Sequence, residues 1–127
     1  MHQISAQEHE IMKIIWSAGS DHLTTRDIET RLFDIDGKKR NLSSLMTVIA
    51  RLVDKNFLEP VKKYRKSTYF TALIEEREFK VYVTKQFIDG IHDGKLSGFV
   101  SALIDGGQYT QQDIEELRNM IDKIKHP

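Results

Sequence analysis

The segment from Lys38 to Leu73 constrains the fold of this 127-residue chain more than any other part of it. It begins with a basic run, continues as an amphipathic helix over residues 42–56, and ends as a hairpin with a positively charged tip. Its nine cations are accompanied by only two acidic residues, although the whole chain has no formal net charge. This order is typical of a winged helix-turn-helix, in which one helix enters the DNA major groove and a charged loop lies beside it.

Helix-start signals predict the elements that precede this segment. Ser5 and Glu8 have the spacing of a capping box, and Thr24 or Thr25 can cap a second helix. Residues 22–24 are too few for more than a short connecting strand. The predicted fold class is therefore mainly α: a winged helix-turn-helix of three helices plus a two- or three-stranded wing, followed by a helical dimerisation region.

Charge divides the chain into two halves, which we interpret as two domains. Residues 1–73 carry a net charge of +3 and residues 74–127 a net charge of −3. This is expected if the first half binds phosphate and the second binds protein. We therefore predict a winged-helix DNA-binding domain over residues 1–73 and a helical dimerisation domain over residues 74–127.

Dimerisation is predicted because three short helices over roughly 50 residues bury little apolar surface alone. A symmetric homodimer would also match a palindromic operator. The alternative is that these helices fold back on the first half as a monomer. The apolar residues expected to join two copies are Phe79, Val83, Phe87, Phe99, Leu103, Ile114, Leu117 and Ile121.

The polar face of the helix over residues 42–56 is the candidate base-reading surface. A helix-turn-helix reads bases with the N-terminal residues of its second helix, on the face turned away from the core. The alternative interpretation is a merely solvated face of a core helix, but the flanking cations favour DNA. The residues predicted to read bases are Asn41, Ser43, Ser44, Met46 and Thr47.

The basic residues on either side of this helix are predicted to contact DNA phosphates. Adjacent like charges at a hairpin tip do not help folding, whereas a phosphate partner would explain them. The alternatives are solubility and protection of a sheet edge by lysine. The predicted phosphate contacts are Lys38, Lys39, Arg40, Arg51, Lys62, Lys63, Arg65 and Lys66.

Other classes of function have little support in the sequence. The absence of cysteine excludes disulfides, thiolate metal sites and cysteine nucleophiles, and the five histidines lack metal-ligand spacing. We therefore expect no enzyme, no cofactor and no metal. No apolar run long enough to span a membrane and no secretory signal are present, so we expect a cytoplasmic protein. A protein–protein adaptor is the alternative function, and Met46 would be its only exposed apolar candidate on the third helix.

Four segments resemble the BlaI/MecI penicillinase-repressor family in order and spacing over nearly the whole chain. They are ISAQEHEIMKIIW at 4–16, NLSSLMTVIARLVDKNFL at 41–58, STYFTALI at 67–74 and DIEELRNMIDKI at 113–124. The resemblance implies a cytosolic bacterial repressor with an N-terminal winged helix and a C-terminal dimerisation region. It also implies control of a β-lactam-resistance-type or related stress gene.

The chain departs from the family pattern at three places. The best-known penicillinase repressors carry Lys and Arg early in the recognition helix, where this chain has Ser43 and Met46. The copper-responsive branch uses C-terminal cysteines, which are absent here. In the β-lactam branch a membrane sensor protease triggers cleavage at an Asn-Phe bond, and the matching bond here is Ala102–Leu103. The sensor is thus a partner that only the resemblance implies, and the dipeptide does not support it.

Overall fold

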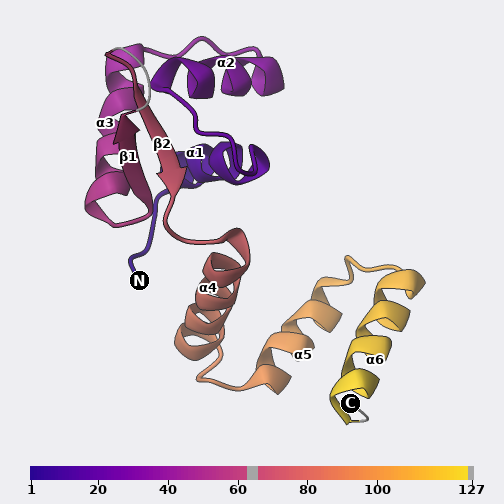
Figure 1. Ribbon diagram of the computed structural model, residues 1–127. Helices are drawn as coiled ribbons and strands as arrows, with labels where there is room; N and C mark the ends of the chain where they lie inside the picture. Colours follow the sequence, from indigo (N-terminus) through magenta and orange to yellow (C-terminus); the bar gives the residue numbers. More distant parts are fainter. Residues whose placement is uncertain (63–65, 126–127) are drawn as a thin grey trace. The chain divides into compact units, whose positions relative to one another are not determined.

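The computed structural model describes residues 1–62 and 66–125, and among these it contains six helices and one two-stranded antiparallel sheet (Figure 1). The chain forms two compact units, Met1–Thr84 and Lys85–Pro127, and α4 contributes to both. No helix in the described ranges is long and apolar enough to cross a membrane. The elements are α1 (Ala6–Ser17), α2 (Thr25–Asp36), α3 (Leu42–Asp54), β1 (Leu58–Lys62), β2 (Thr68–Ala72), α4 (Glu76–Ile91), α5 (Leu96–Gly106) and α6 (Gln111–Lys125).

The first two helices begin at the predicted capping residues. The Ser5 hydroxyl accepts a hydrogen bond from the backbone N–H of Glu8 at 3.1 Å, and the Glu8 carboxylate accepts one from the Ser5 N–H at 2.9 Å. Thr24 and Asp27 repeat this reciprocal arrangement at the start of α2. Each box satisfies two backbone donors that a helix start otherwise leaves without partners, so both starts are fixed locally.

The core of the first unit is formed by the apolar faces of α1, α2 and α3 together with the hairpin. The four buried residues of α3, Leu45, Val48, Ile49 and Leu52, lie on one face at helical spacing, as predicted. The buried hydrophobic residues are Ile11, Met12, Ile14, Ile15, Leu23, Ile28, Leu32, Leu45, Val48, Ile49, Leu52, Phe57, Leu58 and Phe79. The opposite face of α3 is consequently left to solvent.

The β1–β2 hairpin follows α3 directly and forms the wing. The strands pair in antiparallel register with Leu58 opposite Ala72. On the other side of β2, Leu23 forms an isolated bridge with Phe70, whose N–H donates to the Leu23 carbonyl at 2.8 Å. Pro60 lies on the outer strand β1, where its missing N–H costs no ladder bond. The winged helix-turn-helix with a third, minimal strand is therefore confirmed.

An aromatic cluster joins the start of α4 to the rest of the first unit. Phe79 packs its ring 5.5 Å from that of Trp16 and 5.8 Å from that of Phe57, measured between centroids. The indole N–H of Trp16 donates to the Ile74 carbonyl at 2.8 Å. Phe79 is only 8% exposed, so its assignment to the dimerisation stripe is corrected: it is a core residue of the first unit.

One charged side chain, Glu8, is buried in the described part of the first unit. The ammonium of Lys55 donates to the Glu8 carboxylate at 2.9 Å and to the Gln3 carbonyl at 3.1 Å. Burial raises the pKa of Glu8, but the hydrogen bonds from Ser5 and Lys55 outweigh it and hold that pKa below its usual value. The pair therefore ties the end of α3 to the start of α1.

Candidate nucleic-acid interface

The N-terminal part of the exposed face of α3 presents neutral side chains, most of them small. Ser43, Ser44 and Thr47 are all exposed, and Met46 is 54% exposed. The Thr47 hydroxyl donates to the Ser43 carbonyl at 3.1 Å, while the residue itself remains exposed. Small neutral side chains allow a helix to approach the floor of the major groove, where a methyl group can contact thymine.

Asn41 has a structural role that the sequence pattern did not predict. It is the N-cap of α3, and its side-chain oxygen accepts the Ser44 N–H at 3.1 Å. The amide NH₂ group remains able to donate to a base. The signal for this cap was an Asn placed directly before an apolar-periodic run.

The predicted phosphate contacts are placed unequally by the structure. Four of them are exposed: Lys38 and Lys39 on the α2–α3 connection, Arg51 on α3, and Lys66 in the turn before β2. Each of these side chains can therefore contact a partner in solvent without any rearrangement of the core. The side chain of Lys62, together with Lys63 and Arg65, lies outside the described residues.

Arg40 differs from the exposed cations because its guanidinium is paired with acidic residues. Its Nη2 atom lies 2.6 Å from an Asp36 carboxylate oxygen and 3.7 Å from the Glu10 carboxylate. The hydrogen bonds from Arg40 and from the Lys38 backbone N–H lower the pKa of Asp36 to about 2. The hydrogen bond to Asp36 raises the pKa of Arg40 in turn. The acid–base spacing of four residues was the available sequence signal for this pair.

Because of the Asp36–Arg40 pair, we expect the free energy of unfolding to depend on pH under acidic conditions. Because the folded pKa of Asp36 is depressed, its contribution is fully present above the unfolded pKa of 3.8 and is lost as pH falls through about 2. We expect wild type to unfold at higher urea than Asp36→Asn at pH 7, with the difference shrinking below pH 4. A difference that stays constant down to pH 2.5 would contradict the pairing.

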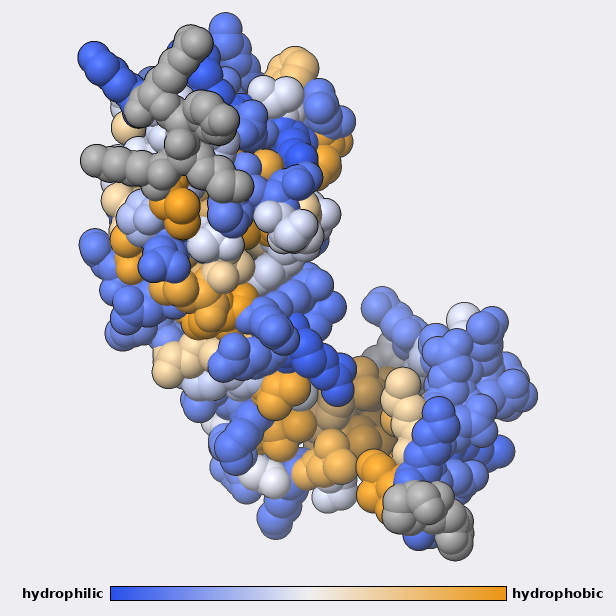
Figure 2. All heavy atoms as spheres, viewed as in Figure 1, coloured by the Kyte–Doolittle hydropathy of each residue, from blue (hydrophilic) through white to orange (hydrophobic). Residues whose placement is uncertain are grey.

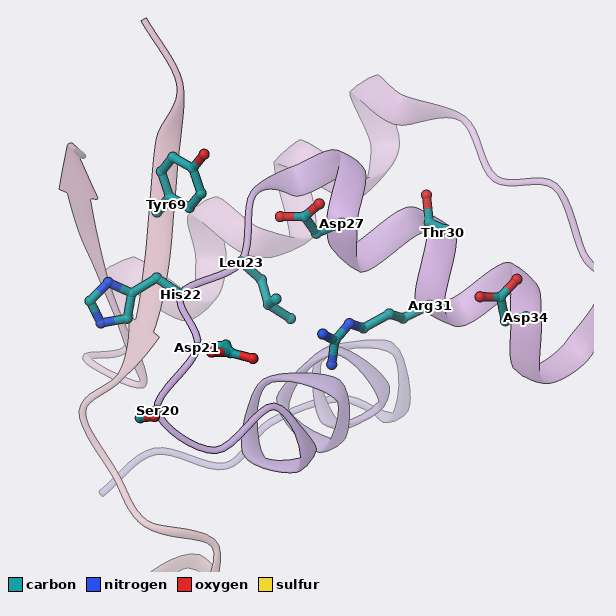
Figure 3. A pocket seen from close by; sticks show the side chains of 9 residues that line it. All are labelled: Ser20, Asp21, His22, Leu23, Asp27, Thr30, Arg31, Asp34 and Tyr69. Carbon is teal, nitrogen blue, oxygen red and sulfur yellow. The ribbon is translucent and has the colours of Figure 1, made fainter. Parts of the chain in front are cut away.

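A polar depression lies between α2 and β2, away from the exposed face of α3. Figure 3 shows Asp21 and Arg31 extending into it, whereas the ring of His22 points away from both. Among the residues that the structure describes, no group of three or more His, Asp or Glu side chains could hold a metal ion. The depression has a volume of about 610 Å³ and is lined by Ser20, Asp21, His22, Leu23, Asp27, Thr30, Arg31, Asp34 and Tyr69.

The second unit leaves most of its apolar surface uncovered. Neither α5 nor α6 contains a buried residue. Within this unit, Phe87, His92 and Phe99 form an aromatic cluster with ring centroids 5.5–6.1 Å apart. Apolar side chains gather over α5 in Figure 2, while the outward side of α6 in that view is hydrophilic. The exposed apolar residues of the second unit are Phe87, Ile91, Leu96, Leu103, Ile104, Tyr109, Leu117, Met120, Ile121 and Ile124.

A comparison with protein-family models shows to which family the chain belongs. The model of the penicillinase repressor family matches residues 4–123. The chain belongs to this family. Members of the family are transcriptional repressors, so this family member is a DNA-binding repressor and not an enzyme.

Individual relatives match over nearly their whole length. The methicillin resistance regulatory protein MecI of Staphylococcus aureus (strain N315) is 30% identical over 124 residues, covering 96% of this chain and 95% of the relative. The penicillinase repressor of Bacillus licheniformis is 27% identical over 126 residues, covering 98% and 93%. The resemblance to the BlaI/MecI family is thereby confirmed.

Two solved structures show the same fold at low sequence identity. RosR of H. salinarum superposes with a TM-score of 0.53 at 12% identity, covering 98% of this chain and 96% of that one. MepR, a transcription regulator of the Staphylococcus aureus multidrug efflux pump MepA, gives a TM-score of 0.52 at 11% identity, covering 96% and 78%. This penicillinase-repressor family member thus shares its fold with proteins of very different sequence.

Proposed function

We propose that two copies of this repressor bind a palindromic operator in the cytoplasm, with α3 of each copy in a major groove. The observation that carries this proposal is the pairing, on one unit, of a small neutral face on α3 with exposed cations on either side of it. Phosphate contacts set register and general affinity, whereas base-edge contacts set sequence preference. Lys38, Lys39, Arg51 and Lys66 fit the first role, and Ser43, Ser44, Met46 and Thr47 fit the second.

A homodimer is supported by the unburied surfaces of α5 and α6. Monomeric proteins rarely leave large contiguous apolar patches exposed, and a second copy is the simplest cover for such a surface. Val83 belongs to the first unit and is also exposed. With Phe79 removed, the proposed dimerisation residues are Val83, Phe87, Phe99, Leu103, Ile114, Leu117 and Ile121.

Selection from random DNA identifies the operator directly, whichever gene it controls. The full-length protein is used to select duplexes from a random-sequence pool, and the enriched sequences are footprinted. We expect two inverted half-sites whose centres lie about one helical turn apart, ~10 base pairs, or a multiple of it. Enrichment of a single asymmetric site, or no enrichment at all, would contradict the proposal.

Thr47 provides a test of base reading on α3. We expect Thr47→Ala to weaken binding to the selected duplex by ~1–3 kcal/mol, because a lost base contact costs this much. Binding to random-sequence DNA should not change. Since the hydroxyl is already bonded to the Ser43 carbonyl, Thr47→Ser should lose as much as Thr47→Ala if the methyl group makes the contact. Anisotropy titrations with both duplexes measure this, and equal losses on both would remove Thr47 from the base-reading set.

The relatives also bear on which gene is regulated and on the signal that ends repression. The names of the relatives support a β-lactam-resistance-type or related stress gene as target. Ala102 and Leu103 lie within α5, so this bond must unfold locally, and Leu103 must leave the proposed dimer surface, before a protease can cut it. Mass spectrometry of the protein recovered from its host after β-lactam treatment would show fragments ending at Ala102 if a membrane sensor protease controls it.

A further inference from the structure

The connection between α2 and α3 is organised by one carboxylate. α2 ends at Asp36, and Gly37 follows in the left-handed conformation with φ of 67°. The Asp36 carboxylate accepts the Lys38 backbone N–H at 2.9 Å and the two terminal nitrogens of Arg40 at 3.2 and 2.6 Å. Arg40 also donates to the Lys38 carbonyl at 3.2 Å, so the turn is closed on itself.

Arg40 extends this arrangement to α1 and to the start of α3. Its guanidinium lies 3.7 Å from the Glu10 carboxylate on α1, and its side chain is 22% exposed. The next residue, Asn41, caps α3 through its bond to the Ser44 N–H. Arg40 therefore lies one residue before the N-cap of α3, and its guanidinium is paired with carboxylates of two other helices.

This geometry is unfavourable for a phosphate contact by Arg40. Two carboxylates surround the charge, and a DNA phosphate would have to displace a bidentate, charge-assisted pair to reach it. The neighbouring Lys38 and Lys39 are exposed and need no such exchange. The last cation before α3, Arg40, thus stabilises the turn, although its charge suggested a role in binding DNA.

We propose that Arg40 is a positioning residue for DNA recognition: by joining Asp36 and Glu10, it fixes where α3 begins and how the Asn41 cap is presented, and it does not contact phosphate. The proposal rests on the proposed function of α3 as the base-reading helix. A turn already ordered in the free protein avoids the entropy loss of ordering it on DNA. The planar fork of arginine makes two parallel bonds that a lysine cannot reproduce.

The test compares full-length Arg40→Gln and Asp36→Asn on the selected duplex and on a random-sequence duplex across a salt series. We expect each variant to bind the selected duplex roughly tenfold more weakly, the loss that one charge-assisted hydrogen bond represents. The slope of log K against log salt and the affinity for random DNA should stay at wild-type values. The double variant should bind no more weakly than either single variant, because both remove the same clamp.

Lys39→Gln is the matched control, since it removes one positive charge at the adjacent exposed position. It should weaken binding to both duplexes and reduce the salt slope by about 0.9. Thermal unfolding of every variant verifies that the fold persists. If Arg40→Gln behaves like Lys39→Gln, or if Asp36→Asn tightens binding by releasing Arg40, the positioning role is overturned. If the wild type selects no duplex at all, the proposed function fails instead, and the two failures are thereby distinguished.

Discussion

Replacing Ile121 with lysine is expected to separate the proposed dimer and to weaken operator binding by roughly 10²–10⁴-fold. Two linked binding units exceed the affinity of a single unit by a factor in this range. Ile121 is 46% exposed on α6, a helix with no buried residue in the single chain. A buried ammonium without a partner would make pairing of two such surfaces strongly unfavourable. In the monomer the same lysine is solvated, so the fold of each copy should persist.

Asn119→Lys is the matched control for this experiment. It adds the same charge to α6, but two residues away, which places it on the opposite side at about 100° per residue. Sedimentation equilibrium should show monomers for Ile121→Lys and dimers for Asn119→Lys. Binding to the selected duplex should fall only for the first. Dimers that persist in Ile121→Lys would move the interface away from this face of α6.

The second large effect is expected at Phe57, where truncation to alanine should cost about 3–5 kcal/mol of unfolding free energy. Phe57 is fully buried at the junction of α3 and β1, and its ring meets that of Phe79 edge to face. Its N–H donates to the Leu52 carbonyl and its carbonyl accepts the Leu73 N–H, both at 2.9 Å. The wing and the start of α4 therefore depend on this side chain for their position.

Urea unfolding followed by circular dichroism measures this loss at a fixed protein concentration, because the apparent stability of the proposed dimer would depend on concentration. Leu73→Ala is the control, since Leu73 is a neighbour in the same hairpin but is half exposed. It should cost much less than Phe57→Ala. A loss below about 1 kcal/mol for Phe57→Ala would show that the core can collapse into the space left by the ring.

Local signals in the sequence predicted the elements of the first unit well. The capping box of α1, the threonine cap of α2, the apolar face of α3 and the hairpin after Asn56 all depend on residues close together in the sequence. Asn56 itself adopts a left-handed conformation with φ of 62°, as expected for a residue that ends a helix. Such features are encoded locally and do not depend on the rest of the fold.

Partners that are distant in sequence were not predictable in this way. Phe79 has the same spacing as the apolar residues after it, and periodicity shows that a helix face is apolar without showing what covers it. The structure places it against Trp16 and Phe57. Lys55 reaches Glu8 across 47 positions, which no local pattern encodes. Gly90 has a low helix propensity, yet α4 continues to Ile91, because one glycine costs only about 1 kcal/mol.

The residues of the candidate site likewise include some whose contacts the sequence did not predict. Charge alone grouped Arg40 with Lys38 and Lys39, whereas the structure assigns its guanidinium to Asp36. Polarity alone grouped Asn41 with Ser43 and Thr47, whereas its side-chain oxygen caps α3. Composition suggested this surface, but hydrogen-bond partners were needed to separate residues that build the surface from residues exposed on it.

We propose that exposed cations hold any DNA while the neutral face of α3 selects the sequence. A salt titration of wild type, Lys66→Gln and Thr47→Ala separates these two roles. We predict that Lys66→Gln reduces the slope of log K against log salt by about 0.9 on selected and random duplexes alike. Thr47→Ala should keep the wild-type slope and lose affinity only on the selected duplex. Equal salt slopes for wild type and Lys66→Gln, together with equal affinity losses on both duplexes for Thr47→Ala, would contradict this division of roles.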